Sequence, residues 1–504
     1  MVDHLAAALV GHGVRPGDRI AVLHPKSHWS FVAVHASMRA GAVWVPLDPM
    51  GPIEGIDAVL EACRPTAIIG AEQTIRARAS RWLERRDPLV VATGDDLQAL
   101  EAVVTNPVLS VEHIAHATDD ADVDDTTLPD LTPSDPAYII FTSGSTGEPK
   151  GILHTHRSGL AYVENAVATH DLRPDDRIAG TCPLHFDMST LELYAAPAAG
   201  SSIVVVTEAE LRFPVSLSKR LETTASTIIY AVPYQLRQLC QRGALDQHDV
   251  SAVRQVGFGG EQFAASALDE VMTAFPTAEF LNVYGPAEVN GVVSHRFPPG
   301  APVVDGVPIG HAWDGIDLRI VDEELVDVSP GDDGELLVAS PSQMTGYWER
   351  PELNERIFVE ADGRRWYRTG DIVCAGPDGL MWFRGRADTR IKVRGVRLEL
   401  ETIESVLSDA PGVDSAVVGV EDVEGVQRVI SWILPNRDDL DAGGASRVDP
   451  NELRRWCAMR LPDSAVPGDV RFVASFPSTR SGKIDRRAVR AELDAAQLTD
   501  VDRP

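Results

Sequence analysis

Short apolar runs alternate with helix-like stretches in the first part of the chain. Four such runs, IAVLH, AVWVPL, AIIGA and PLVVAT, fall between residues 20 and 110. Strands that alternate with helices form βα units, so this pattern predicts a parallel sheet. The same alternation returns at 201–206, 226–233, 253–260 and 278–285. We therefore expect a large α/β domain built from layered sheets.

The hydrophobic pattern changes near residue 300. Short strands separated by Gly, Pro and Asp turns follow, as in LRIVDEELVDVSPGDDGELLVAS, and they predict a β-barrel-like subdomain. From about residue 389, strands and helices alternate on a smaller scale, which predicts a small α+β domain. The acidic, proline-bearing stretch 118–136 is expected to be a solvated linker.

Length and composition limit the class of protein. The 504 residues exceed one ordinary core, so two or more domains are expected. A formal net charge of −29 argues against nucleic-acid binding, which requires a basic surface. The five cysteines form no C-x-x-C pair, and neither a signal peptide nor an 18-residue apolar run is found. These features predict free thiols in a cytoplasmic protein.

The stretch FTSGSTGEPKG, residues 141–151, directly follows an apolar run that reads as a buried strand. Glycines let backbone N–H groups approach an anion, hydroxyls add donors, and Lys150 adds a positive charge, so the stretch suits phosphate. It is not the common phosphate loop, because Pro149 precedes the lysine, and a flexible surface loop remains the alternative. His154 and His156 have metal-like spacing, but in a strand leaving this loop we expect them to be structural.

Further motifs follow this stretch in a fixed order. They are HFDMS (185–189), NVYGPAE (282–288), GELLV (334–338), GYW (346–348), YRTGD (367–371), GRADTRIKVRGVRLELETIE (385–404) and SGKIDR (481–486). The set resembles the adenylate-forming superfamily, which holds acyl-CoA synthetases, luciferases and the adenylation domains of nonribosomal peptide synthesis. It is most similar to the last group.

The resemblance implies a division of labour along the chain. Residues 1–386 would form a core that binds ATP and the acid, and residues 387–504 a small mobile lid with its hinge at Asp388. In the first half-reaction a carboxylate attacks the α-phosphate of MgATP and releases pyrophosphate. In the second, a thiol attacks the acyl-adenylate.

The same resemblance assigns the nucleotide site. Tyr284 would stack on adenine beside Gly285, Asp371 would accept hydrogen bonds from the ribose, and Arg386 would lie near ribose and phosphate. A surface ion pair between Arg386 and Asp388 is the alternative. The β- and γ-phosphates would be held by the opening loop, that is, by Thr142, Ser143, Gly144, Ser145, Thr146, Gly147 and Lys150.

Two residues are expected to act on the reacting charges. Glu288 would bind Mg²⁺, a hard cation that prefers oxygen ligands. Lys483 would stabilise the negative charge that builds up on the α-phosphate during displacement. The chain departs from the family at Ala287, where a threonine hydroxyl usually contacts the α-phosphate, and this puts the rate in doubt.

Asp187 indicates the class of acid. In family adenylation domains this aspartate pairs with the substrate's amino group, and a carboxylate in an apolar pocket is costly without a cation. It therefore favours an amino acid, whereas a helix N-cap before the helix-like STLELYAA is the alternative. His185 departs from the pattern of amino-acid-activating domains. Acyl-CoA synthetases often carry a histidine near this position, so His185 does not decide between the two classes.

Alignment of the motifs predicts an apolar side-chain pocket without a second charge. Phe258 falls where a small residue is common, which makes the pocket shallow and favours a small neutral amino acid, either α or β. The predicted lining residues are Met188, Leu191, Tyr230, Val256, Phe258, Val283, Gly291 and Val292.

The thiol is expected to arrive from another molecule. No carrier segment with a phosphopantetheine serine follows Lys483, so the leading interpretation is a stand-alone amino acid:carrier-protein ligase. Its partner would be a phosphopantetheinylated carrier protein, with CoA as the alternative thiol. An acyl- or aryl-CoA synthetase, favoured by His185, and an inactive binding protein of the same fold, suggested by Ala287, are the alternatives.

Overall fold

The structure is a computed structural model of the chain. It describes residues 1–94, 96–116, 128–142, 149–304, 306–386, 390–393, 396–423, 426–436, 448–473, 475–477 and 489. The chain divides into two compact units, and the division falls between Arg386 and Arg390. Of the described residues, those up to Arg386 belong to the large unit, apart from 52–55, and those from 390 onward belong to the small unit. The hinge residue expected at 388 lies outside the described residues.

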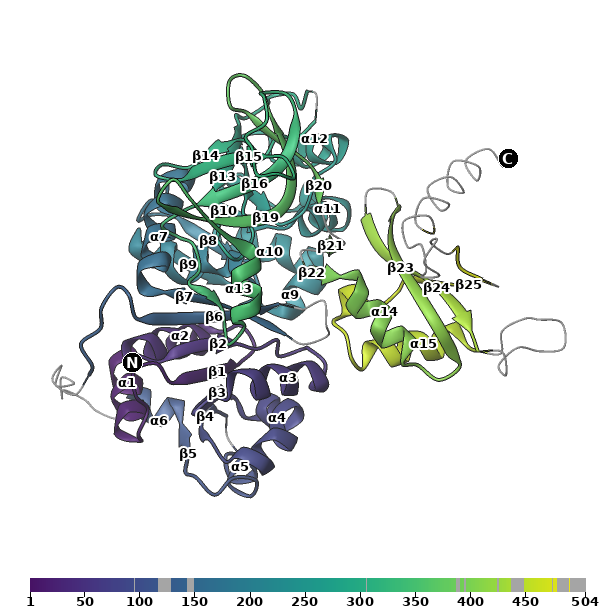
Figure 1. The fold of residues 1–504 in the computed structure, drawn as a ribbon. Coiled ribbons are helices and arrows are strands. Elements are labelled where there is room, and N and C mark those ends of the chain that lie inside the picture. Colours follow the sequence, from purple (N-terminus) through teal and green to yellow (C-terminus); the bar gives the residue numbers. More distant parts are fainter. Residues whose placement is uncertain are drawn as a thin grey trace. The chain divides into compact units, whose positions relative to one another are not determined.

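The first sheet of the large unit has eight strands (Figure 1). The strands from the first βα units pair in parallel, as predicted, whereas β7 and β17 join antiparallel at one edge. In sheet order they are β17 (Gly346–Tyr347), β7 (Lys150–Thr155), β6 (Pro136–Thr142), β2 (Val43–Pro46), β1 (Arg19–Leu23), β3 (Ala67–Ala71), β4 (Leu89–Thr93) and β5 (Val108–Ser110).

Helices cover both faces of this sheet, as expected for βα units (Figure 1). Helices α1 (Val2–Gly11), α2 (His28–Arg39) and α6 (Val111–His116) pack with Ile20 and Val22 of β1. Helices α3 (Ile53–Cys63) and α4 (Glu72–Arg86) pack with Ala21 and Leu23, which point the other way. The short helix α5 (Gln98–Glu101) adds Leu100 to this second face.

The second sheet has seven strands and carries the later βα units. Its strands β9, β8, β10, β11 and β12 are parallel, and β13 and β14 extend it antiparallel. In sheet order they are β14 (His311–Ala312), β13 (Val293–Phe297), β12 (Glu279–Tyr284), β11 (Gln255–Gly259), β10 (Ile228–Ala231), β8 (Arg177–Gly180) and β9 (Ser202–Val205).

The two faces of this second sheet have different neighbours. On one face, which we call the site face, Tyr230 and Val283 pack with α7 (His156–His170) and with β16 and β19 of the next sheet. On the opposite, outer face, Ile229 and Phe280 pack with the helices α10 (Pro214–Thr224), α11 (Pro233–Arg242) and α12 (Ala265–Ala274). The remaining short helices of this unit are α8 (Ala196–Ala198), α9 (Glu208–Arg212) and α13 (Pro351–Ile357).

The strands after residue 300 form a five-stranded antiparallel sheet. Its central strand is β19 (Arg364–Ala375), and its other members are β15 (Asp317–Val321), β16 (Asp333–Ala339), β18 (Phe358–Ala361) and β20 (Met381–Arg386). A barrel-like unit was expected here, but in the described chain β15 and β18 are edge strands that do not pair with each other. The sheet therefore stays open.

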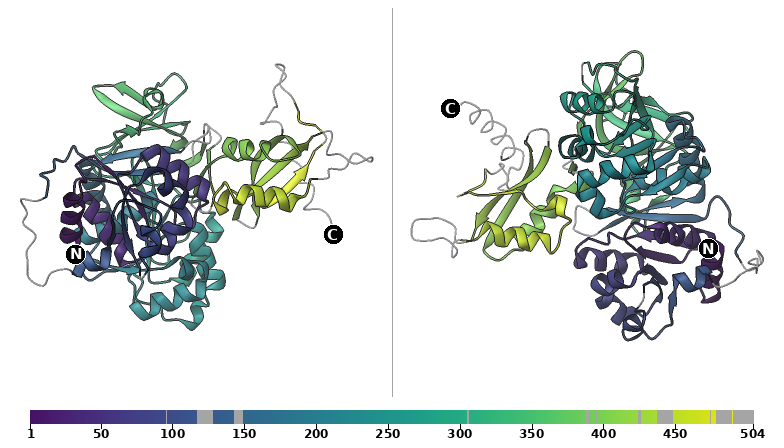
Figure 2. Two further views of the ribbon diagram at one scale, coloured as in Figure 1. Left: turned by 90° about the horizontal axis from the view of Figure 1, so that it is seen from below. Right: turned by 180° about the vertical axis from the view of Figure 1, so that it is seen from behind.

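The small unit has the predicted α+β composition and its own hydrophobic core. A two-stranded hairpin, β21 (Arg390–Val393) and β22 (Val396–Glu399), precedes the three-stranded sheet β23 (Val413–Val423), β24 (Val426–Pro435) and β25 (Asp469–Phe472). Helices α14 (Leu400–Ser408) and α15 (Pro450–Ala458) pack together on one face of this sheet (Figure 2). Among the described residues, none of the helices combines the length and apolar character that a membrane span requires.

His170, at the end of α7, is fully buried in the large unit. Its Nδ1 lies 2.9 Å from Gln255 Oε1, and the Gln255 amide donates back to the His170 carbonyl over 3.2 Å. Burial lowers the pKa of His170 to about 4, and the nearby guanidinium groups of Arg254 and Arg296 act in the same direction. The ring is therefore neutral in the folded protein near pH 7.

This difference predicts a pH dependence of stability. Below pH 6.5 an unfolded histidine takes up a proton, whereas folded His170 stays neutral down to about pH 4. Its contribution to stability is therefore complete above pH 6.5 and is lost as the pH falls. Between pH 7 and pH 5, His170→Leu should lose about 2 kcal/mol less unfolding free energy than the wild type. Urea unfolding at both pH values measures this, and equal losses in the two proteins would contradict it.

Candidate active site

The structure brings three predicted nucleotide-binding residues together. Tyr284 ends β12, and its hydroxyl donates to Asp371 Oδ2 over 2.5 Å. Asp371 lies on β19 directly opposite Arg386 on β20, and the two side chains form an ion pair. Arg386 also donates to the Thr369 carbonyl over 2.9 Å. The Arg386 guanidinium is thus engaged with Asp371, whereas its alternative partner Asp388 lies outside the described residues.

Charge and burial define what this cluster can do. Burial raises the pKa of Tyr284 well above its usual value, and the Asp371 carboxylate raises it further, so the phenol stays a hydrogen-bond donor. Asp371 is almost fully buried and accepts from Arg386 at one oxygen and from Tyr284 at the other. Each carboxylate oxygen has a second lone pair, so Asp371 retains the capacity to accept from two adjacent hydroxyls.

The loop that follows Tyr284 is folded tightly onto itself. A Cβ at Gly285 would lie 1.6 Å from the Asn290 carbonyl oxygen, so only glycine allows this approach. One segment outside the loop fixes its backbone at two points: the Met344 N–H donates to the Glu288 carbonyl, and the Ser342 hydroxyl donates to the Val289 carbonyl, each over 2.7 Å. The backbone conformation of the loop that carries Glu288 is therefore fixed.

His154 supports the same loop from β7. Its Nε2 lies 3.0 Å from the Ala287 carbonyl oxygen, and its Nδ1 lies 3.1 Å from Ser158 Oγ. Its ring stacks on Tyr138, with centroids 4.7 Å apart and planes 14° from parallel. A carbonyl can only accept, so Nε2 carries the proton and His154 acts as a donor to the backbone. These contacts match the structural role expected for this histidine.

The Glu288 side chain is fully buried, and the Tyr347 hydroxyl donates to its Oε1 over 2.7 Å. No group of three or more His, Cys, Asp or Glu residues that could hold a metal ion occurs in the described chain. Mg²⁺ in phosphate sites is commonly bound by one or two carboxylates together with the phosphates. A single carboxylate such as Glu288 therefore fits a magnesium ion that is shared with ATP.

The expected phosphate loop connects the two strands of a hairpin. Thr142 at the end of β6 pairs with Lys150 at the start of β7. This geometry differs from the common phosphate loop, which leads from a strand into a helix. The other predicted members, Ser143, Gly144, Ser145, Thr146 and Gly147, lie outside the described residues, as do Lys483 and Asp388.

Asp187 begins a 3₁₀ turn, Asp187–Ser189, which is followed by a π-helical turn, Leu191–Ala195. The expected regular helix is therefore replaced by two irregular turns, and Phe186 rather than Asp187 takes the capping position. Burial raises the pKa of Tyr162, Tyr230 and the Cys182 thiol, and the Asp187 carboxylate raises all three further. The Asp187 carboxylate thus lies close to the two phenols and the thiol.

His185 occupies a different position. Its Nε2 lies 3.9 Å from Asp48 Oδ2, and its ring packs on Phe186 with the ring centroids 4.7 Å apart. Burial lowers the pKa of His185, although Asp48 opposes this shift.

Most of the predicted lining residues belong to one cluster on the site face. Tyr230, Val283, Leu191 and Val292 are buried in this cluster, and the partly buried Met188 packs against it. The Trp313 indole fills the space beside Gly291, where a Cβ would lie 2.5 Å from the ring.

Val256 and Phe258 were predicted to line the same pocket, but the structure places them on the outer face. There both residues pack in the cluster that contains Phe263 and Phe280. The parallel register pairs Gly257 with Tyr230 and Gly259 with Val283, so these two glycines occupy the site face. Side chains alternate between the two faces along a strand, and the motif alignment assigned β11 the wrong parity.

Three further residues at this face were not predicted. Tyr162 and Cys182 lie near the Asp187 carboxylate, and Trp313 packs beside Tyr162 with ring centroids 6.2 Å apart. The Tyr230 ring lies against Gly257, where a Cβ would come within 2.7 Å of it. The two-residue alternation of VGFGG was a signal that its glycines share a face, but it does not say which face.

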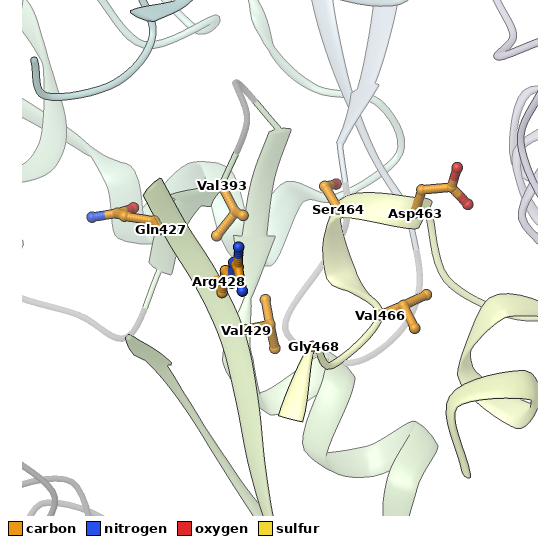
Figure 3. A pocket seen from close by; sticks show the side chains of 8 residues that line it. All are labelled: Val393, Gln427, Arg428, Val429, Asp463, Ser464, Val466 and Gly468. Carbon is orange, nitrogen blue, oxygen red and sulfur yellow. The ribbon is translucent and has the colours of Figure 1, made fainter. Parts of the chain in front are cut away.

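A separate small pocket lies in the small unit (Figure 3). Its volume is about 190 Å³, and its lining residues are Val393, Gln427, Arg428, Val429, Asp463, Ser464, Val466 and Gly468. The polar ends of Gln427 and Asp463 point away from its centre (Figure 3). None of the predicted site residues lines it.

Comparison with known proteins identifies the family. The family model for AMP-binding enzymes matches residues 1–348, and the model for the C-terminal domain of AMP-binding enzymes matches residues 402–483. The chain belongs to the AMP-binding enzyme family. As a member of this family it is an ATP-dependent, AMP-forming ligase.

Individual AMP-binding enzymes show how far the similarity extends. An L-proline--[L-prolyl-carrier protein] ligase of Streptomyces coelicolor is 33% identical over 497 residues, covering 98% of this chain and 90% of the relative. A dimodular nonribosomal peptide synthase of Bacillus subtilis is 30% identical over 505 residues, and the chain spans 20% of its length. The structure of amide bond synthetase McbA from Marinactinospora thermotolerans matches with a TM-score of 0.82 at 26% identity, covering 97% of this chain and 93% of that one.

The close approach at Gly285 predicts the effect of one methyl group. Gly285→Ala must displace the Asn290 carbonyl and so distort the loop that carries Glu288. We expect a loss of about 2 kcal/mol of unfolding free energy, typical of overpacking, and at least a tenfold fall in ATP–pyrophosphate exchange. Gly11→Ala is the matched control, since nothing lies within 4 Å of a Cβ there. Equal exchange and melting temperatures for the two variants would contradict the prediction.

Proposed function

We propose that the protein activates a small neutral amino acid as its aminoacyl-adenylate and transfers it to the phosphopantetheine thiol of a separate carrier protein. The observation that carries this proposal is the placement of the Asp187 carboxylate beside the buried, uncharged Tyr162, Tyr230 and Cys182. A carboxylate near buried apolar and phenolic groups attracts a cation strongly, and the ammonium group of an amino acid is such a cation. The carrier-protein ligase of Streptomyces coelicolor, similar over nearly its whole length, supports the same activity.

The first half-reaction uses the nucleotide cluster. Asp371 would accept from the ribose hydroxyls, Arg386 would hold Asp371 and face the phosphate, and Tyr284 would pack on adenine. An oxygen of the amino acid carboxylate attacks the α-phosphorus, the bond to the β-phosphate oxygen breaks, and pyrophosphate leaves. Glu288 would hold Mg²⁺, which neutralises phosphate charge, and Lys483 would stabilise the developing charge at the α-phosphate.

The second half-reaction needs an acceptor. The sulfur of a phosphopantetheine thiol attacks the acyl carbon, the thiol proton is lost, and AMP leaves as the acyl–phosphate bond breaks. We assign this step to an arrangement in which residues 387–504 have rotated about Asp388 relative to residues 1–386. A cytoplasmic location suits the ATP requirement and the five cysteines, all of which are free thiols.

One observation favours a second candidate for this step. The structure of an amide bond synthetase aligns over 97% of the chain with a TM-score of 0.82. Discharge of the adenylate onto an amine, which gives an amide and AMP, is therefore the second candidate. A panel of acceptors comprising a phosphopantetheinylated carrier protein, free CoA and simple amines separates the candidates by which of them consumes the purified adenylate.

The proposed size limit rests on aromatic rings rather than on Phe258. The Tyr230 ring lies against Gly257, and the Trp313 ring takes the space beside Gly291. Both rings are buried and fixed in the same cluster. We therefore propose that they limit the substrate to a short, uncharged side chain.

The role of Asp187 predicts a selective loss. Acid-dependent ATP–pyrophosphate exchange should respond strongly to one small amino acid in a panel that includes both chiralities, β-amino acids, aryl acids and short fatty acids. In Asp187→Ala the exchange with that amino acid should fall at least a hundredfold, because the ammonium group loses its charged partner. Exchange only with acids that lack an amino group would refute the amino acid proposal and favour a CoA synthetase.

The role of Tyr230 predicts a change in substrate size. Tyr230→Val should extend exchange to amino acids with larger side chains, because the ring against Gly257 is removed. Tyr230→Phe is the matched control, since it keeps the ring and should keep the wild-type preference. The same order of preference in all three proteins, measured as kcat/KM in the exchange assay, would show that Tyr230 does not limit substrate size.

A further inference from the structure

A buried ion pair lies at the base of the segment that carries Asp187. Lys26, between β1 and α2, is 5% exposed, and Glu192, in the π-helical turn, is 1% exposed. The Lys26 ammonium donates to the Gly180 carbonyl over 2.8 Å, to the Cys182 carbonyl over 2.7 Å and to the Glu192 carboxylate. An ammonium has three protons, so this set of acceptors satisfies it completely.

Glu192 closes the arrangement from the other side. Its Oε1 accepts from the Cys182 N–H over 2.9 Å, while its Oε2 takes Lys26. Burial raises the pKa of Glu192, and the Lys26 charge opposes this shift. Cys182 is thus held through its N–H by Glu192 and through its carbonyl by Lys26.

These bonds join the two ends of one loop. The loop leaves β8 at Gly180, passes through Cys182, carries Asp187 and Met188, and returns at Glu192. Inside it, the Ser189 hydroxyl donates to the Phe186 carbonyl over 2.7 Å, and the Thr190 hydroxyl donates to the Asp187 carbonyl over 2.6 Å. The position of Asp187 therefore depends on where the loop is closed, since its interior is already rigid.

Lys26 is itself fixed from outside the loop. The next residue, Ser27, caps α2 by accepting from the Ser30 N–H, and the Lys26 N–H donates to Glu208 over 3.1 Å. The π-helical turn on the other side is also held, because the Tyr194 hydroxyl accepts from the Trp44 indole over 2.7 Å. Such π-helical turns are rare in proteins, and those that occur often lie at functional sites.

Stability alone does not account for an ion pair at this place. A buried pair is often replaceable by apolar residues of similar volume without loss of stability, whereas it does impose one geometry. The Cys182 thiol lies near both the Asp187 and Glu192 carboxylates, since each raises its pKa. The Lys26 ammonium is paired with Glu192, so the pair holds the loop that carries Asp187 without adding a net charge to it.

We propose that Lys26 and Glu192 are positioning residues that hold the Cys182–Glu192 loop so that Asp187 meets the ammonium group of the substrate. This inference rests on the proposed function. It implies that loss of the pair weakens recognition of the amino group more than it weakens ATP binding.

The test measures KM for the amino acid and for ATP separately, by ATP–pyrophosphate exchange in the full chain. The amino acid is the one that gives the strongest wild-type exchange, and its deamino analogue reports recognition of the amino group. Lys26→Met and Glu192→Gln should raise the amino acid KM at least tenfold and change the ATP KM less than threefold. They should also reduce the preference for the amino acid over its deamino analogue at least tenfold, and Lys26→Arg should recover part of both effects.

Asp176→Asn is the matched control. It breaks a second ion pair, in which the half-buried Arg254 donates to the buried Asp176 over 2.6 Å and 2.8 Å, just before the other end of β8. This variant should lower the melting temperature while leaving the amino acid KM and the preference unchanged. Parallel changes in both KM values for the Lys26 and Glu192 variants, in step with their melting temperatures, would overturn the positioning role.

If the single Lys26 and Glu192 variants do not fold, a double variant still tests the proposal. The double variant Lys26→Met/Glu192→Leu replaces both charges by apolar groups and is expected to fold. A wild-type amino acid KM in this folded variant would overturn the proposal. If the wild type itself exchanges only with acids that lack an amino group, the proposed function fails, and the inference fails with it. Wild-type activity on the amino acid with unaffected variants overturns the inference alone.

Discussion

The direction of four parallel strands determines where the chemistry of this protein is located. Strands β8, β10, β11 and β12 run the same way, so their carboxyl ends meet at one edge of the sheet. The Asp187 loop follows β8, Tyr230 lies near the end of β10, and the Glu288 loop follows β12. Ligands of open α/β sheets bind outside the carboxyl ends of the strands. Side-chain alternation along the same strands then decides which residues face the site.

The protein has a net charge of −29, and several of its carboxylates are buried, which is costly unless each one accepts hydrogen bonds. Each buried carboxylate around the site has a defined donor: Arg386 and Tyr284 for Asp371, Tyr347 for Glu288, and Lys26 for Glu192. These donors fix the carboxylates in position and make their burial tolerable. The Asp187 carboxylate lies near two phenols and a thiol, and it raises the pKa of all three.

The sequence alone predicted the βα units, the parallel pairing and the presence of Tyr284, Asp371 and Arg386 in one site, because these depend on local pattern and on motifs. It misplaced Val256 and Phe258. Alternation shows that the two residues share a face of β11, but it does not show whether that face is the site face or the outer face. It did not reveal the Lys26–Glu192 pair, whose members are 166 residues apart and meet only through tertiary packing. The open five-stranded sheet was missed for a similar reason, because strand closure is not encoded in turn composition.

The two parts of substrate recognition depend on the structure in different ways. Gly257 and Gly259 present no side chains to the site face, so a single ring, Tyr230, occupies the space above β11. In the proposed function, the size of the substrate side chain would be limited by this ring together with the Trp313 ring beside Gly291. Recognition of the amino group, as proposed, would depend instead on a loop whose two ends are joined by a buried ion pair. On this proposal, substrate size depends on single rings, whereas the position of the Asp187 carboxylate depends on several residues acting together.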